Sequence, residues 1–110
     1  MIAATVSPAT TGTDLYTLIE TATPGQLGTL FTGRVAEVHI QWLAGVSHLV
    51  YKSGTVNLAT DSGFMFDNVD GKREYVLRAT SHNQISLKDI YLAGVTGGGT
   101  DTVRVSAYTI

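Results

Sequence analysis

The feature that most constrains the fold is an alternation of apolar and polar residues with a period of two. It is clearest in the segment RVAEVHIQW (34–42), where Glu37, His39 and Gln41 stand between apolar residues. Successive side chains of a β-strand point to opposite faces, so the pattern indicates a strand with one dry and one wet face. We interpret Glu37, His39 and Gln41 as the outer side of a half-buried sheet, in preference to a catalytic site.

Similar short runs recur along the chain. The candidate strands cover residues 34–43, 46–53, 55–60, 63–67, 73–80, 85–93 and 102–109. Gly, Asn, Asp and Ser mark the turns between them, at a spacing of about ten residues that is typical of all-β domains. The sequence therefore predicts a mainly β protein of about seven strands, an antiparallel β-sandwich or a jelly roll. An immunoglobulin-like strand order fits the same pattern.

The N-terminal region has a different pattern. The segment TDLYTLIETATPG begins with residues that cap helices and ends with Pro-Gly, and Leu15, Leu18 and Ile19 have helical spacing. It predicts one short N-terminal helix over residues 14–22, with a strand as the alternative. Residues 1–12 are small and polar and predict an arm without a core of its own. The expected organisation is thus an N-terminal arm, 1–12, followed by a single β-sandwich domain, 13–110.

The two central candidate strands predict a hairpin. With residues 44–45 as its loop, Ile40 lies opposite Leu49, and His39 and His48 share the outer face. In residues 85–92 the apolar set shifts by one position, which predicts a bulge at 88–89. The segments WLAGVS (42–47) and YLAGVT (91–96) resemble each other, but six residues are too few to separate duplication from chance, and we favour chance.

The chain offers few groups for chemistry. Two histidines provide too few ligands for a metal site, and the sequence indicates no others nearby. The segment DNVDG (67–71) lacks the spacing of a calcium loop and is interpreted as a turn. An enzyme would need Glu37 with His39 or His48 and a further acid in one cleft, and Glu37 and Glu74 could also pair on one face. We expect no enzyme, and no catalytic, cofactor-binding or metal site.

Charge and hydropathy restrict the partners. The net charge is −2, and only 15% of the residues are charged. Binding to phosphates needs clustered Lys and Arg, and the densest basic position here is the pair Lys72-Arg73. The sequence has no apolar run that could span a membrane, no secretory signal at its start and no cysteine. We therefore expect neither nucleic acid nor membrane as a partner, and the low charge favours a surface covered by neighbouring subunits.

Four segments follow the polar N-terminal region in a fixed order: LYTLIE, RVAEVHIQ, DIYLAG and TVRVSAY. This order resembles that of small virion proteins of tailed bacteriophages, over most of the chain from residue 13 to residue 108. Residues 53–84 contribute nothing to the likeness. Capsid decoration (cement) proteins, head fibres and tail-associated β modules belong to this group. The resemblance implies a structural role without a cofactor, and it carries no binding residues to this chain.

The expected function is that of a capsid decoration (cement) protein, which binds the outer capsid surface as a homo-oligomer. A trimer is favoured because capsids offer threefold and quasi-threefold positions. The partners are then the chain itself and the major capsid protein or other virion proteins, contacted through the arm 1–12 and the sheet edges. The protein would be made in the host cytoplasm and located in the virion.

The alternative function is a carbohydrate- or receptor-binding β module of a phage tail or fibre. Such a module would need exposed aromatic side chains. The candidates are Tyr16, Tyr75, Tyr91 and Tyr108.

Overall fold

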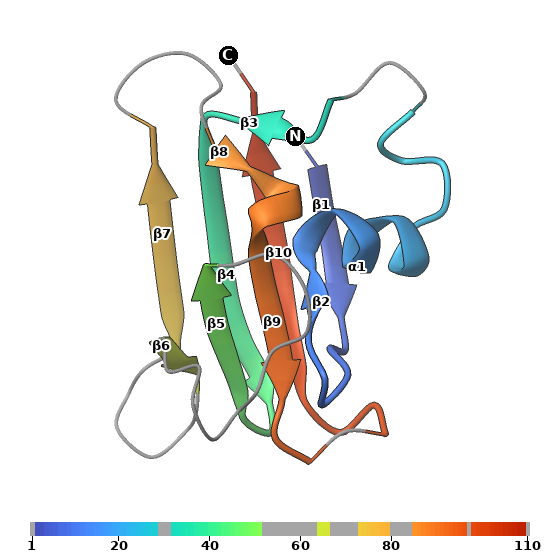
Figure 1. Cartoon of the computed structure of the whole chain (residues 1–110), viewed down its shortest axis with the longest axis vertical. Coiled ribbons are helices and arrows are strands. Elements are labelled where there is room, and N and C mark those ends of the chain that lie inside the picture. The colour runs from blue at the N-terminus through green and yellow to red at the C-terminus, as the bar shows by residue number, and fades with distance from the viewer. Residues whose placement is uncertain are drawn as a thin grey trace.

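The computed structural model describes residues 2–28, 32–51, 64–66, 73–79, 85–96 and 98–109, which form two antiparallel sheets in two layers (Figure 1). The first sheet contains, in spatial order, β1 (Ile2–Val6), β10 (Thr102–Tyr108), β4 (Glu37–Ala44) and β7 (Glu74–Arg78). The second contains β2 (Thr13–Asp14), β9 (Ile90–Gly94), β5 (Ser47–Tyr51) and β6 (Phe64–Phe66). A small third sheet pairs β3 (Arg34–Val35) with β8 (Ile85–Ser86). The expected mainly β, sandwich-like fold is confirmed.

The strands pair in a nested order. β1 pairs with β10, β2 with β9, β3 with β8, β4 with β7 and β5 with β6, and every pair is antiparallel. The pairing is thus that of one long hairpin, and its successive pairs fall in the first, the second, the small third, again the first and again the second sheet. Contacts of β10 with β4 and of β9 with β5 join the pairs within each sheet. The two ends of the chain therefore meet in neighbouring strands.

The predicted hairpin between residues 34–43 and 46–53 is wrong. β4 pairs with β10 and β7 in the first sheet, whereas β5 pairs with β9 and β6 in the second. Gly45, with a φ of 71°, lies where the chain crosses between the sheets. A period-two pattern identifies the buried face of a strand but not its neighbour. The predicted face is confirmed, because Val38 and Ile40 are both buried.

The expectation of an arm over residues 1–12 is wrong for residues 2–6. They form β1, which pairs with β10, and Ala4 and Val6 are only 3% and 2% exposed. The alternation in this segment is short, and its partner strand lies at the other end of the chain. For this reason the local sequence did not reveal the strand.

The predicted helix is confirmed as α1 (Leu15–Ala22). The side chain of Asp14 caps it by accepting a hydrogen bond of 3.0 Å from the backbone N–H of Thr17. Leu15, Leu18 and Ile19 are buried. The helix lies beside β1 and β2, at one open side of the sandwich (Figure 1).

The core lies between the two sheets. Its largest buried side chains include Ile40, Val103 and Val105 from the first sheet and Phe66 and Leu92 from the second.

The predicted bulge at residues 88–89 is replaced by a 3-10 turn, η1 (Leu87–Asp89). The turn still brings Leu87, Ile90 and Leu92 into the core. The strands predicted at 63–67, 73–80 and 102–109 appear as β6, β7 and β10, and Arg73, Ala79 and Thr109 lie just outside them. The strand expected at 55–60 lies outside the described residues.

Candidate functional site

The outer face of the first sheet carries the polar residues that alternate along β4. Across the strands, Glu37 lies opposite Tyr108 of β10 and Arg78 of β7. One step along, His39 lies opposite Ser106 and Val76. Glu37, His39, Arg78 and Tyr108 are termed the Glu37 cluster here. Its members come from three strands that are distant in the sequence, and sheet pairing alone brings them together.

A hydrogen bond, a close polar contact and a ring contact connect the Glu37 cluster. The Glu37 carboxylate accepts a hydrogen bond from Arg78 Nε, and its Oε2 atom lies 3.1 Å from Nε2 of His39. The rings of His39 and Tyr108 meet edge to face, with centroids 5.4 Å apart. The hydrogen bond from Arg78, followed by the close polar contact with His39, lowers the pKa of Glu37 below its ordinary value. Glu37 is therefore an ionised acceptor at neutral pH, whereas a general acid would need a raised pKa.

A shallow pocket adjoins the cluster. Its volume is about 270 Å³, and it is lined by Ala36, Glu37, Arg78, Ala79, Tyr108 and Thr109. This volume lies just below the range of about 300–1,000 Å³ that is typical of small-molecule sites. The carboxylate, the guanidinium group and the phenol ring could hold one small polar group by hydrogen bonds.

The other residues that sequence reasoning linked with this site are separated from it. His48 lies on β5 in the second sheet, so the prediction that it shares a face with His39 is wrong. Glu74 does share the outer face with Glu37, but it lies opposite Gln41. Four residues along a strand separate the two carboxylates by roughly 13 Å, too far for them to share a proton.

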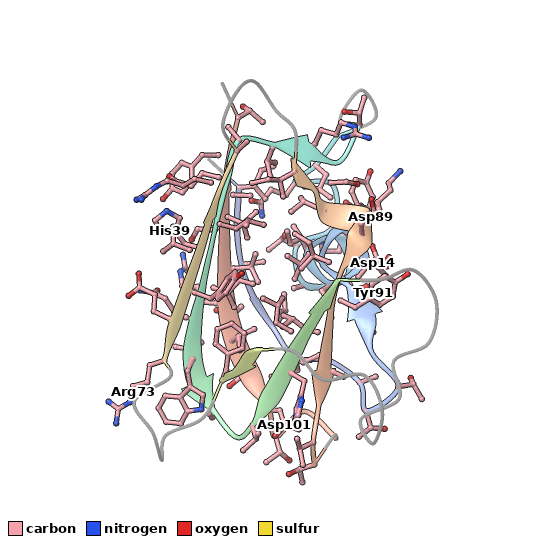
Figure 2. All side chains as sticks on the ribbon, turned by 60° about the vertical axis from the view of Figure 1, so that its left-hand side comes forward. Asp14, His39, Arg73, Asp89, Tyr91 and Asp101 are labelled. Carbon is pink, nitrogen blue, oxygen red and sulfur yellow. The ribbon has the colours of Figure 1, made fainter. Side chains whose placement is uncertain are left out.

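Figure 2 shows how far apart the labelled polar residues lie. His39 is on one outer side of the sandwich, and Tyr91 is on the opposite side with Asp14 and Asp89. Within the described part of the chain, no three His, Asp or Glu side chains gather in a way that could hold a metal ion. The expected turn at 67–71 lies outside that part.

A second polar centre, at one end of the sandwich, was not predicted. Asp101 is only 1% exposed and lies just before β10 (Figure 2). Its Oδ1 atom accepts a hydrogen bond of 2.9 Å from the N–H of Val46, and its Oδ2 atom accepts one of 2.9 Å from the N–H of Thr96. One buried carboxylate thus joins the segment after β4 to the segment after β9.

Two glycines make room for this carboxylate. A Cβ atom at Gly45 or at Gly94 would collide with the side chain of Asp101. Both glycines occupy the same place in the similar segments WLAGVS and YLAGVT. That likeness, interpreted as chance from the sequence, was the available signal for a shared structural requirement.

Comparison of the chain with protein families, with curated proteins and with solved structures finds no significant match. Among the described residues, no helix is long and apolar enough to cross a membrane.

Proposed function

We propose that this chain is a virion structural protein of the capsid-decoration kind, without enzymatic activity, which binds the outer capsid surface as a homo-oligomer. The observation that supports this most is the nested strand order. A long hairpin wound into two four-stranded sheets is the plan of the eight-stranded jelly roll, and we infer that the fold is of this type. Viral capsid domains are prominent users of that plan, together with lectins and cupins.

The environments of two acidic residues, one on an outer face and one buried, support the same proposal. The Glu37 cluster is an ion-paired group on an outer face, and its carboxylate is a stable anion. Asp101, the buried acid, accepts hydrogen bonds from the backbone and holds two loops together. Both acids thus have roles in holding the fold. The strand order supports the proposal by analogy with viral capsid domains, because the same fold serves several functions.

The corrected N-terminus changes how docking would occur. Because residues 2–6 are part of the first sheet, they are not free to order against a neighbour. The sheet edges and outer faces remain as contact surfaces with the major capsid protein or other virion proteins. A threefold assembly, suggested by capsid symmetry, stays part of the proposal.

The test is to purify intact particles of the phage that carries this sequence and to measure the copy number of the chain by quantitative mass spectrometry. We expect a copy number that matches the capsid symmetry, and density on the outer capsid surface when a labelled chain is imaged. Absence of the chain from intact, infectious particles would overturn the proposal.

A second candidate function is favoured by one observation. Tyr108 is 37% exposed and lines the shallow pocket together with Glu37 and Arg78. An exposed aromatic ring beside a carboxylate and a guanidinium group suits a sugar ring, which stacks on the aromatic face and donates hydrogen bonds. This arrangement favours a carbohydrate-binding module of a tail or fibre.

A glycan array separates the two candidates. A carbohydrate-binding module should give saturable binding that is lost in Tyr108→Ala and retained in Arg104→Ala, a substitution at an exposed residue of the same strand that does not line the pocket. No signal with the native chain would remove the second candidate.

A further inference from the structure

The β7 strand ends the first sheet, and its outer edge is the surface that carries our inference. On its inner edge, Arg73 O accepts a hydrogen bond from Trp42 N–H, and Ala79 N–H donates to Ala36 O. Residues at odd-numbered positions of β7 therefore direct their backbone groups toward β4. Glu74, Val76 and Arg78 direct theirs away from it. No strand among the described residues pairs with this outer edge, and β7 is the outermost arrow of its sheet in Figure 1.

The side chains of the same three residues point to the outer face of the sheet, where they lie opposite Gln41, His39 and Glu37. All three are exposed. Among the side chains that the structure describes, Val76 is one of four large apolar ones that are exposed, at 36%. The edge thus presents three backbone donors, three backbone acceptors and a side-chain order of acid, apolar, base.

This order is complementary to itself when it is reversed. If two copies of β7 lie antiparallel with Val76 opposite Val76, then Glu74 of each copy lies opposite Arg78 of the other. All three opposed positions are hydrogen-bonded pairs, because each directs its N–H and C=O toward the other copy. Opposite charges placed directly across two strands stabilise the pairing, and like charges destabilise it.

We propose that β7 pairs with β7 of a second copy of this chain about a twofold axis through Val76. The two four-stranded sheets then form one continuous sheet of eight strands. The hydrogen bond from Arg78 Nε to Glu37 helps, because it holds the guanidinium group on the outer face. In the pair, Arg78 lies between Glu37 of its own chain and Glu74 of the other. Such a contact uses the same patch on both copies and closes at two subunits.

The inference does not rest on the proposed function. A twofold contact does not produce the threefold ring suggested by capsid symmetry. A mass measurement on the purified chain tests the contact without reference to any particle.

The first experiment measures the mass of the chain by sedimentation equilibrium over a hundredfold range of concentration. We expect a monomer–dimer equilibrium for the native chain. Val76→Pro removes an N–H that faces the free edge and leaves the ladder to β4 intact, so we expect at least a tenfold weaker dimer. Val76→Thr keeps that N–H and serves as the matched control, with little change. Circular dichroism and a thermal melt confirm that each variant is folded.

The second experiment tests the register through charge. Glu74→Arg makes the edge wholly basic, and Arg78→Glu makes it wholly acidic, so each variant alone should be monomeric. Mixed together, the two should form a heterodimer, because the two opposed pairs of charged residues are then each of opposite charge. The double variant Glu74→Arg, Arg78→Glu should again form a homodimer, weaker than that of the native chain because the new carboxylate at position 78 lies opposite Glu37.

Three results would overturn the inference. These are a native chain that is monomeric at every concentration, an oligomer that Val76→Pro leaves unchanged, and a mixture of the two charge variants that stays monomeric. A trimer that is insensitive to all edge variants would overturn the twofold contact and leave the proposed function standing.

Discussion

The two edge strands of the first sheet, β1 and β7, differ in whether a side chain occupies their outward backbone groups. At the β1 edge, the side-chain amide of Gln26 accepts a hydrogen bond of 2.8 Å from Ala3 N–H and donates one of 3.0 Å to Ala3 O. These are the two bonds that a further strand would make with Ala3. At the β7 edge, no described side chain occupies the backbone groups in this way, and Glu74 and Arg78 flank an exposed Val76.

The difference separates two means of controlling an open edge. A side chain that occupies the backbone groups blocks pairing with any strand. Charged residues discourage pairing with most strands and permit it with a strand of the complementary charge order. In this molecule the blocked edge also lies beside α1, whereas the charged edge belongs to the strand farthest from the helix (Figure 1).

The largest effect on stability should come from removing the blocked edge strand, β1, altogether. Deleting residues 1–6 exposes β10 and removes the buried side chains of Ala4 and Val6. We expect the free energy of unfolding to fall by about 3–5 kcal/mol, from lost apolar burial and lost ladder hydrogen bonds. Urea denaturation measures this. If stability is unchanged, β1 is a free arm after all, and the comparison of edges fails.

The second largest effect should come from a substitution next to β10, the strand that joins β1 to the rest of the first sheet. Asp101→Ala removes the acceptor of two backbone N–H groups just before β10, the strand that links β1 to β4. We expect a loss of about 2–4 kcal/mol in the free energy of unfolding, because buried donors are left unpaired. Asp101→Asn keeps one acceptor oxygen, and its loss should be smaller. Equal loss in both variants would show that charge, and not the two hydrogen bonds, holds the loops.

A smaller effect should follow from unblocking the β1 edge without deleting it. Gln26→Ala removes both bonds to Ala3 where water can replace them, so we expect about 0.5–1.5 kcal/mol. Hydrogen exchange at the Ala3 amide, followed by NMR, should accelerate. Gln26→Glu retains the acceptor and serves as the matched control, in which the Ala3 amide stays protected. If the alanine variant also begins to associate, occupation of the backbone groups is what prevents pairing there.

The smallest effect should be a pH dependence confined to the β7 side. Arg78, and then His39, lower the pKa of Glu37 from its ordinary 4.5. A carboxyl group whose folded pKa is lowered stabilises the fold above its unfolded pKa, and this contribution disappears as the pH falls through the folded value. The protection factors of the Tyr75 and Leu77 amides, which compare each exchange rate with that of an unfolded peptide at the same pH, should therefore fall below about pH 4.5. The β1 edge, which is capped by the neutral amide of Gln26, should show no such change.

Glu37→Gln is the control for the acid effect. The glutamine cannot ionise, so the protection factors of the β7 amides should lose their dependence on pH in this range. An unchanged dependence in this variant would assign the effect to another group.

Local patterns predicted the parts of the structure that depend on near neighbours in the chain. The alternation around Val38 and Ile40 identified the buried face of β4, and helical spacing after Asp14 identified α1. These predictions succeeded because the direction of a side chain follows from the backbone conformation of its own segment.

The candidate site was only half predictable. Glu37 and His39 were correctly placed on an outer face, since they alternate with buried residues on the same strand. Their contacts with Arg78 and Tyr108 could not be inferred, because those residues come from strands about forty and seventy positions away. The sequence does not identify Val76 as a contact residue, since its role depends on which side of β7 is unpaired.

The amino-acid order was sufficient for the class of fold, the dry side of each central strand and the start of the helix, all of which are matters of short-range stereochemistry. The choice of neighbouring strands was decided by the folded molecule as a whole. β1 beside β10, the crossing at Gly45 and the loops joined by Asp101 all unite residues that are remote in sequence. An alternating strand can satisfy its backbone hydrogen bonds with many partners, and packing of the complete core selects among them.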